Sequence, residues 1–125
     1  MRITKFEDIE GWKESRNLGQ LIIKVTEDRR RFTDSHLIQQ IRNCVDSAMA
    51  NIAEGFDSGS DKEFVRFLKM AYRSVSELQS HFYFALDSHF IDQDVFEKVK
   101  SQAMLTKAQI GGFMRYLSRP RVKPK

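Results

Sequence analysis

The clearest pattern of hydrophobic residues in this sequence lies between positions 64 and 85. Apolar residues recur there at alternating spacings of four and three, with mostly polar residues between them. This spacing places them on one stripe of an α-helix but would scatter them over both faces of a strand. The pattern therefore predicts an amphipathic helix over about residues 61–88. Its buried stripe is Phe64, Leu68, Ala71, Val75, Leu78, Phe82 and Ala85.

Three further segments show the same helical period. They cover about residues 8–27, 35–54 and 93–118, and short polar turns separate them. No proline occurs before Pro120, so none interrupts these helices. Four amphipathic helices joined by short turns predict an all-α, antiparallel, up-down-up-down four-helix bundle. We expect one domain over residues 1–118 and a basic, mobile tail over residues 119–125, placed to fold back on Glu54, Asp57 and Asp61.

The turn before the residue 61–88 helix carries the most specific local signals. Ser60 stands three residues before Glu63, which is the spacing of a capping box, with Ser60 and Glu63 each accepting from the other's N–H. Gly55 lies just beyond the preceding apolar pattern, where we expect a left-handed helix cap. Asn51 falls on an apolar stripe, and we expect it to hold the backbone of the next turn. Together with Glu54, these residues form the predicted structural turn.

Two other helix starts carry capping residues. Thr33, Asp34 or Ser35 can accept a backbone N–H at the start of the helix over residues 35–54. Asp92 stands at the equivalent position before the last helix. These caps predict where the turns between the helices end.

The amino-acid composition gives the chain a small net positive charge. The chain has 125 residues, of which 41% are hydrophobic and 30% charged, with a net charge of +4 and a pI near 9.3. A basic protein favours anionic partners such as nucleic acid. The N-terminus lacks the apolar run of a signal peptide, and no segment is apolar over the length of a membrane span. We therefore expect a cytoplasmic protein without a membrane partner.

The sequence offers little catalytic or metal-binding chemistry. It contains neither a glycine-rich phosphate loop nor a Gly-x-Ser-x-Gly motif. Glu77 and His81 stand one helical turn apart, but no matching pair occurs on another helix, which favours a surface pair. Cys44 lies on an apolar helix face without a visible base, which favours a small core residue. We expect no enzyme activity, no metal, no cofactor and no small-molecule substrate.

Positive charge is the remaining functional signal. Arg29, Arg30 and Arg31 form a run in the first turn, and Arg42 follows on the next helix. These four arginines are our candidate contacts to RNA phosphates. A structural role for the run is an equally open alternative, because cations near a helix C-terminus interact favourably with the helix dipole.

The residue 61–88 helix also carries more apolar residues than one bundle core can cover. Near its end, Tyr83, Phe84, Leu86 and Phe90 lie outside the main stripe. Large exposed apolar patches are rare on monomers. This excess therefore predicts self-association.

Several short motifs at fixed spacings occur in the first three predicted helices. They are Phe6-Glu7-Asp8-Ile9-Glu10-Gly11-Trp12, Gln40-Ile41-Arg42, Asn51-Ile52-Ala53-Glu54-Gly55, Ser60 with Glu63 and Phe64, Phe67-Leu68, and Ser74 with Glu77 and Leu78. In these motifs the chain resembles the four-helix bundle proteins encoded by 23S rRNA intervening sequences. The resemblance implies an antiparallel four-helix bundle that assembles into a homopentameric ring.

The same resemblance implies a link to RNA. A related branch, the accessory variability proteins of diversity-generating retroelements, binds RNA and a reverse transcriptase, and RNA binding is the usual conjecture for the family itself. This chain departs from the family pattern at Asn43, where a second arginine usually follows Arg42, and at Ser58, where an arginine is common. The first turn also lacks the usual proline. Two lost cations weaken RNA binding at those positions and leave the fold unaffected.

These observations predict a non-enzymatic, oligomeric helical bundle that binds RNA, or an RNA–protein complex, electrostatically. The alternative is a protein-interaction scaffold or accessory subunit that does not bind nucleic acid.

Overall fold

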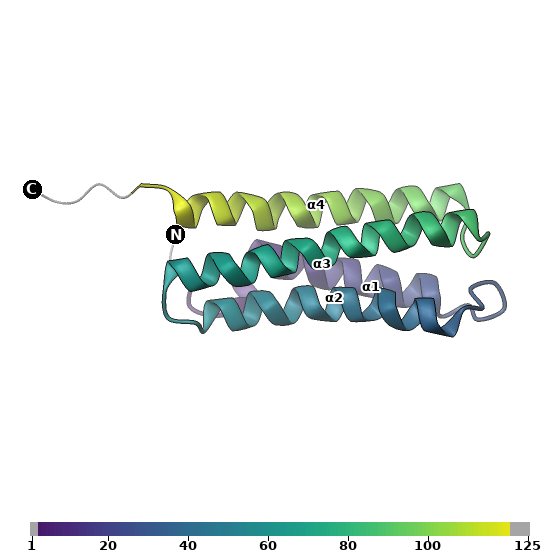
Figure 1. The fold of residues 1–125 in the computed structure, drawn as a ribbon, viewed down its shortest axis with the longest axis horizontal. Coiled ribbons are helices and arrows are strands. Elements are labelled where there is room, and N and C mark those ends of the chain that lie inside the picture. The colour runs from purple at the N-terminus through teal and green to yellow at the C-terminus, as the bar shows by residue number, and fades with distance from the viewer. Residues whose placement is uncertain (1–2, 121–125) are drawn as a thin grey trace, which may run out of the picture.

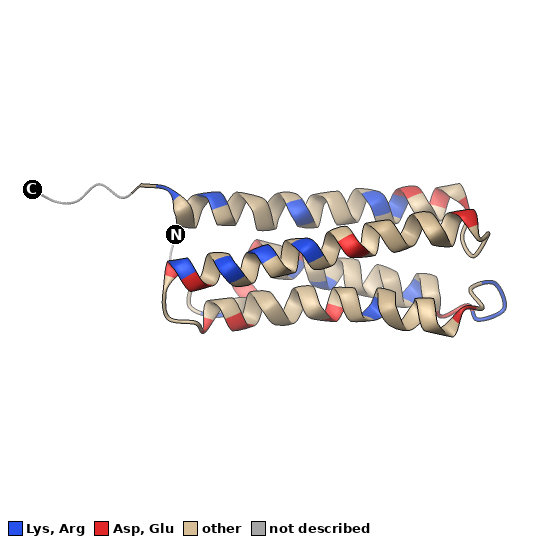
Figure 2. Cartoon of the chain, viewed as in Figure 1, with Lys and Arg blue, Asp and Glu red and all other residues tan. Residues whose placement is uncertain are grey.

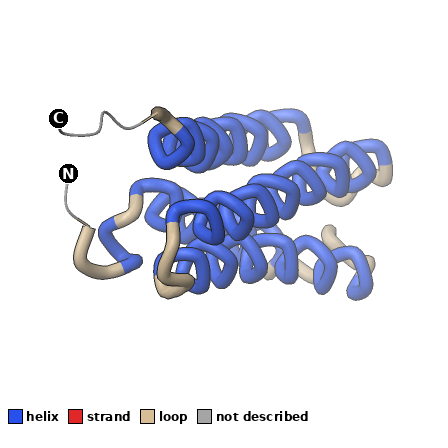
Figure 3. Tube along the Cα trace, turned by 60° about the vertical axis from the view of Figure 1, so that its left-hand side comes forward, coloured by secondary structure: helices blue, strands red, loops and turns tan. Residues whose placement is uncertain are grey.

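The fold is an antiparallel bundle of four long helices, as the sequence predicts (Figure 1). We describe residues 3–120 of a computed structural model of the chain. A short 3₁₀ turn, η1, precedes the helices, and Figure 3 shows the described chain as helices joined by loops. The elements are η1 (Phe6–Asp8), α1 (Glu10–Thr26), α2 (Ser35–Phe56), α3 (Asp61–Asp87) and α4 (Gln93–Ser118).

The helices pack in a closed ring around one core. α1 packs against α2 and α4, and α3 packs against the same two helices. Every residue of the predicted stripe on α3 is buried. Burial of these stripes holds the bundle together, since each fully buried Leu, Ile, Val or Phe contributes about 1.5–3 kcal/mol. The large side chains that α1, α2 and α4 bury completely include Leu18, Ile22, Ile41, Ile52, Val99 and Ile110, and Ile9, just before α1, is buried with them.

Contacts between two turns close one end of the bundle. The ring of Phe32, in the α1–α2 turn, stacks on Phe90 of the α3–α4 turn with centroids 5.1 Å apart. Arg31 lies 3.7 Å from the Asp92 carboxylate across the same two turns. Asp92 accepts from the Val95 N–H at 2.9 Å and caps α4, as predicted. The first and third turns therefore lie at the same end, as an up-down-up-down bundle requires.

Two expectations for the α2–α3 turn are wrong. Gly55 is not a left-handed cap but lies inside α2, and the glycine with positive φ is Gly59, at +90°. The helix continues to Phe56, and the glycine is needed because α2 and α3 are in close contact at this residue, as described below. Asn51 does not hold the next turn. Its amide donates back to the Ser47 carbonyl at 2.9 Å, because the side chain of a helical residue points toward the helix N-terminus.

The cap of α3 is confirmed in its first half. Ser60 Oγ accepts from the Glu63 N–H at 3.2 Å. The Glu63 carboxylate bonds to the Arg66 guanidinium at 3.0 and 3.1 Å, and the return bond to the Ser60 N–H is not among the hydrogen bonds of the described residues. A charged partner on the same helix face replaces the second half of the predicted box.

The first helix begins later than predicted. Residues 6–8 form the separate turn η1, and Ile9 has an extended backbone that places its side chain in the core. α1 then starts at Glu10. The predicted basic tail lies outside the described residues beyond Pro120, and so does its predicted return to the acidic turn. Within residues 3–120, no helix combines the length and apolar character needed to cross a membrane.

Candidate functional site

The four arginines singled out in the sequence lie in the same half of the bundle. Arg29, Arg30 and Arg31 are exposed in the α1–α2 turn, which is blue at one end of the molecule in Figure 2. Arg42 Nε donates to Thr26 Oγ1 at 3.0 Å, which places this arginine beside the last residue of α1. The structure therefore brings positive charge from the turn and from α2 to the end of α1.

Most of these arginines also have partners within the chain. Arg29 donates to Ser35 Oγ, and Arg31 pairs with Asp92. The Arg31–Asp92 pair is about half exposed on both sides, so it contributes little stability and can exchange its partner. Arg42 differs, because its partner Thr26 is fully buried. Arg29, Arg30 and Arg31 are thus more available to an external anion than Arg42 is.

A second group of cations, missed in the sequence analysis, lies along the outward side of α3. Its members follow one another at spacings of four, three and four and are all exposed. Figure 2 shows blue bands along the first half of this helix. The sequence could have revealed this group, because its lysines and arginines recur at the same three- and four-residue spacings as the buried apolar residues of the helix. We call this group the basic row; its members are Lys62, Arg66, Lys69 and Arg73.

The basic row faces the end of α4 across a shallow groove. This groove of about 490 Å³ is lined by Lys62, Arg66 and Lys69 on one side and by Leu117 and Ser118 on the other. Glu63 is in the same groove and pairs with Arg66, so part of the positive charge is neutralised locally. Lys69 and Arg73 are the members of the row farther from the acidic helix start.

A larger cavity of about 560 Å³ lies at the end of the bundle opposite the Phe32–Phe90 contact. The segment before α1, the α2–α3 turn and the end of α4 surround it. Its walls include Phe56, Phe64 and Phe113, and it also carries the carboxylates of Asp8 and Glu10. Because carboxylates repel phosphate, this cavity is a poor site for RNA.

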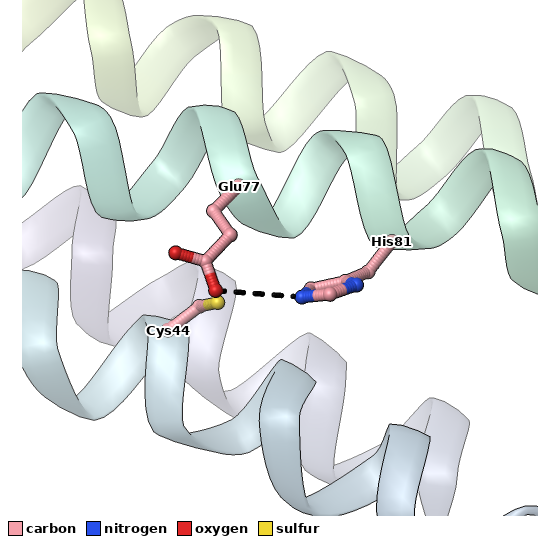
Figure 4. Close-up of side chains that lie close together, drawn as sticks. All are labelled: Cys44, Glu77 and His81. Atoms are coloured by element: carbon pink, nitrogen blue, oxygen red, sulfur yellow. Dashed lines mark ion pairs between the residues drawn. The ribbon is translucent and has the colours of Figure 1, made fainter.

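The structure also assembles a cluster that the sequence did not predict. Cys44 of α2 lies beside Glu77 and His81 of α3, and their ligand atoms are all within 4.8 Å of one another (Figure 4). The expectation that Cys44 has no base beside it is therefore wrong. Helix packing brings the two residues of α3 to the cysteine, and spacing within one helix could not show this.

The environment of Cys44 does not favour a nucleophile. Burial, together with the charge of Glu77 and a hydrogen bond to it, raises the pKa of the Cys44 thiol to about 12. A reactive cysteine needs a pKa lowered toward neutrality, because the thiolate is the nucleophile. The free thiol is therefore protonated near pH 7.

Together, the fold and the exposed cations define a small, basic four-helix bundle. The family model for the 23S rRNA-intervening sequence protein matches residues 7–112, and this chain belongs to that family. The match spans α1 to α3 and much of α4, and it confirms the resemblance seen in the motifs. No curated protein matches the chain.

Proposed function

We propose that this protein is a non-enzymatic, self-associating helical bundle that binds RNA, or an RNA–protein complex, through phosphate contacts. The basic row on α3 is the observation that carries this proposal. Its four side chains extend over about 16 Å of helix, at about 1.5 Å per residue. They lie on a surface that is not buried by the other helices. A straight row of exposed cations is suited to a line of phosphates.

The residue types favour binding that depends on charge rather than on base sequence. Lysine and arginine on a solvated helix face position a nucleic acid backbone, whereas base recognition needs side chains that reach base edges. The family to which the chain belongs supports RNA as the anion. Arg29, Arg30 and Arg31 supply a second contact region at the other end of the bundle. In a self-associated protein, each copy of the chain would contribute both of these contact regions.

Exposed apolar side chains support the self-association. Phe84 and Tyr83 of α3 are 60% and 52% exposed, and Met104 and Leu105 of the neighbouring α4 are 57% and 44% exposed. Phe90, in contrast, is partly buried against Phe32. It therefore adds less than predicted to the exposed apolar surface near the end of α3. A pentameric ring is the assembly that the family resemblance implies.

The test is an RNA-binding titration with a structured RNA at increasing salt. Wild-type protein should bind at low salt, and log affinity should fall linearly with log salt concentration. The double variant Lys69→Gln/Arg73→Gln should reduce that slope by about one for each lost contact. Lys13→Gln/Arg16→Gln, which removes the same charge from exposed positions in the first half of α1, is the matched control and should leave the slope nearly unchanged. A second pair, Arg29→Gln/Arg30→Gln, tests the α1–α2 turn in the same way.

Two results would contradict the RNA proposal. One is the absence of binding by the wild-type chain at about 50 mM salt, where phosphate contacts are strong. The other is an equal loss of binding in both the α3 variant and the α1 control, which would indicate a response to net charge alone. In either case the exposed apolar residues on α3 and α4 would favour the alternative, a protein-interaction scaffold without nucleic acid.

A further inference from the structure

The cluster of Cys44, Glu77 and His81 lies in the seam between α2 and α3, and Glu77 is one helical turn beyond Arg73, the last member of the basic row. Exposure of its members increases from the core outward. Cys44 is 5% exposed, the His81 side chain 22% and the Glu77 side chain 64%. The cluster thus has a buried sulfur at its base and a carboxylate open to solvent, so a small ion has a path of entry.

One polar atom in the cluster has no hydrogen bond. His81 Nε2 is buried and lacks a hydrogen-bond partner, although Glu77 Oε2 lies 3.4 Å away. The dashed line in Figure 4 marks this pair. A buried nitrogen that makes no hydrogen bond costs about 1–3 kcal/mol, and coordination of a cation is one interaction that would satisfy it.

The spacing of these atoms is close to that of ligands on one zinc ion. Zinc takes imidazole nitrogen at about 2.0–2.1 Å, carboxylate oxygen at about 2.0–2.2 Å and thiolate sulfur at about 2.3 Å, in a tetrahedron. Two such N and O ligands are about 3.4 Å apart, by the geometry of that tetrahedron. Nε2 of His81 and Oε2 of Glu77 are 3.4 Å apart. Sγ of Cys44 lies within 4.8 Å of the ligand atoms of both residues, so the sulfur has to come closer by up to about 1.3 Å to complete the set.

We propose that Cys44, Glu77 and His81 form a zinc-binding site with its fourth position occupied by water on the Glu77 side. The donor set of one sulfur, one nitrogen and one oxygen suits Zn²⁺ and disfavours Mg²⁺ and Ca²⁺, which prefer oxygen alone. A cysteine thiolate and a glutamate carboxylate together carry the charge that balances a divalent cation. Binding replaces the proton of the Cys44 thiol, which is released to solvent.

The site would join α2 to α3, and it uses no member of the basic row as a ligand. Glu77 and His81 are one turn apart on the side of α3 that meets α2, so one ion would tie three side chains from two helices. A link of this kind stabilises the folded chain, because the unfolded chain does not hold the ligands together. Zinc binding and RNA binding are independent proposals, and failure of either one leaves the other standing.

The direct test is a titration of the reduced, metal-free full chain with Co²⁺, which takes the place of Zn²⁺ and is visible by absorption. We expect a thiolate-to-cobalt charge-transfer band and the visible bands of tetrahedral Co²⁺, saturating at one ion per chain and lost when Zn²⁺ is added. Cys44→Ser should abolish the charge-transfer band. His81→Gln should weaken Co²⁺ binding by at least about tenfold. His89→Gln, which changes an exposed histidine in the α3–α4 turn, is the matched control and should bind as the wild type does.

A second measurement does not depend on any variant folding. Alkylation of Cys44 in the wild-type chain under mild urea should become slower when Zn²⁺ is added, because the ion both occupies the sulfur and holds α2 against α3. Absence of the charge-transfer band in wild-type protein at micromolar Co²⁺ would overturn the proposal. The same conclusion would follow if His81→Gln bound Co²⁺ as tightly as His89→Gln, or if Zn²⁺ gave Cys44 no protection.

Discussion

Gly55 lies so close to Phe64 that a Cβ atom on the glycine would be 2.7 Å from Cδ1 of the ring. The same Cβ would be 2.9 Å from Cβ of Phe67. Real Cβ atoms do not approach other atoms this closely. Beside the α2–α3 turn, α2 and α3 are therefore so close that residue 55 has room for the hydrogen atom of a glycine but not for a methyl group. This close contact explains a glycine inside a helix.

We expect Gly55→Ala to destabilise the bundle. The added methyl group must displace the Phe64 ring or separate α2 from α3, at a cost of about 1–3 kcal/mol. Urea unfolding followed by circular dichroism measures this change. Gly112→Ala is the control, because its Cβ would lie 3.8 Å from its nearest neighbour, and it should be neutral or stabilising. Equal stability of the two variants would show that α2 and α3 have more room than this contact indicates.

Arg42 offers a way to separate a structural role from an RNA role. Arg42→Lys keeps the positive charge but loses the Nε hydrogen bond to the buried Thr26 hydroxyl. We expect the free energy of unfolding to fall by about 1 kcal/mol while the salt dependence of RNA binding is unchanged. Arg16→Lys, at an exposed position of α1, is the control for stability. A loss of RNA affinity in Arg42→Lys at constant stability would instead place Arg42 in direct contact with RNA.

Self-association is testable at the most exposed of the large apolar side chains. Phe84→Ser removes a ring that is 60% exposed, so it should cost the folded monomer little. If copies meet at this surface, the variant should have a smaller mass than the wild type by light scattering at micromolar concentration. Ile23→Ser is the control, because Ile23 is similarly exposed, at 53%, but lies on α1. A wild-type chain that is monomeric in this measurement would remove the self-association proposal.

The raised pKa of Cys44 predicts how stability depends on pH in the metal-free protein. Burial raises the thiol pKa from 9.0 to about 12 in the folded chain. Between about pH 9 and pH 12 the unfolded chain loses this proton while the folded chain keeps it, so the free energy of unfolding decreases as pH rises. The slope from this one group is at most about 1.4 kcal/mol per pH unit.

Other groups also titrate in this range, so the measurement is a comparison with Cys44→Ala. The stability difference between wild type and variant should be constant below about pH 8 and should shrink as pH rises above about 9. Urea unfolding with a chelator present gives both values. A difference that stayed constant up to about pH 11 would mean that the folded thiol ionises as readily as the unfolded one.

The helices and most of their first residues can be predicted from the amino-acid pattern. The period of Phe64, Leu68 and Ala71 can be satisfied by only one kind of backbone, and every residue of that stripe is buried. Asp92 and Ser60 accept the backbone N–H groups that their positions predict. These features are local, since a helix repeats every 3.6 residues and a cap acts on residues within one turn. The up-down-up-down topology could also be predicted, because short turns force consecutive helices to run antiparallel as neighbours.

The contacts between helices, in contrast, could not be predicted from the sequence. The tight contact of Gly55 with Phe64 depends on the distance between α2 and α3, and the meeting of Cys44 with Glu77 and His81 depends on how far each helix is rotated about its axis. The apolar stripe fixes the rotation of each helix only to within the width of that stripe, and a rotation of about 30° would keep both stripes in the core and would separate the cluster. Side-chain packing between the helices fixes the remaining rotation, which residue spacing within a single helix does not specify.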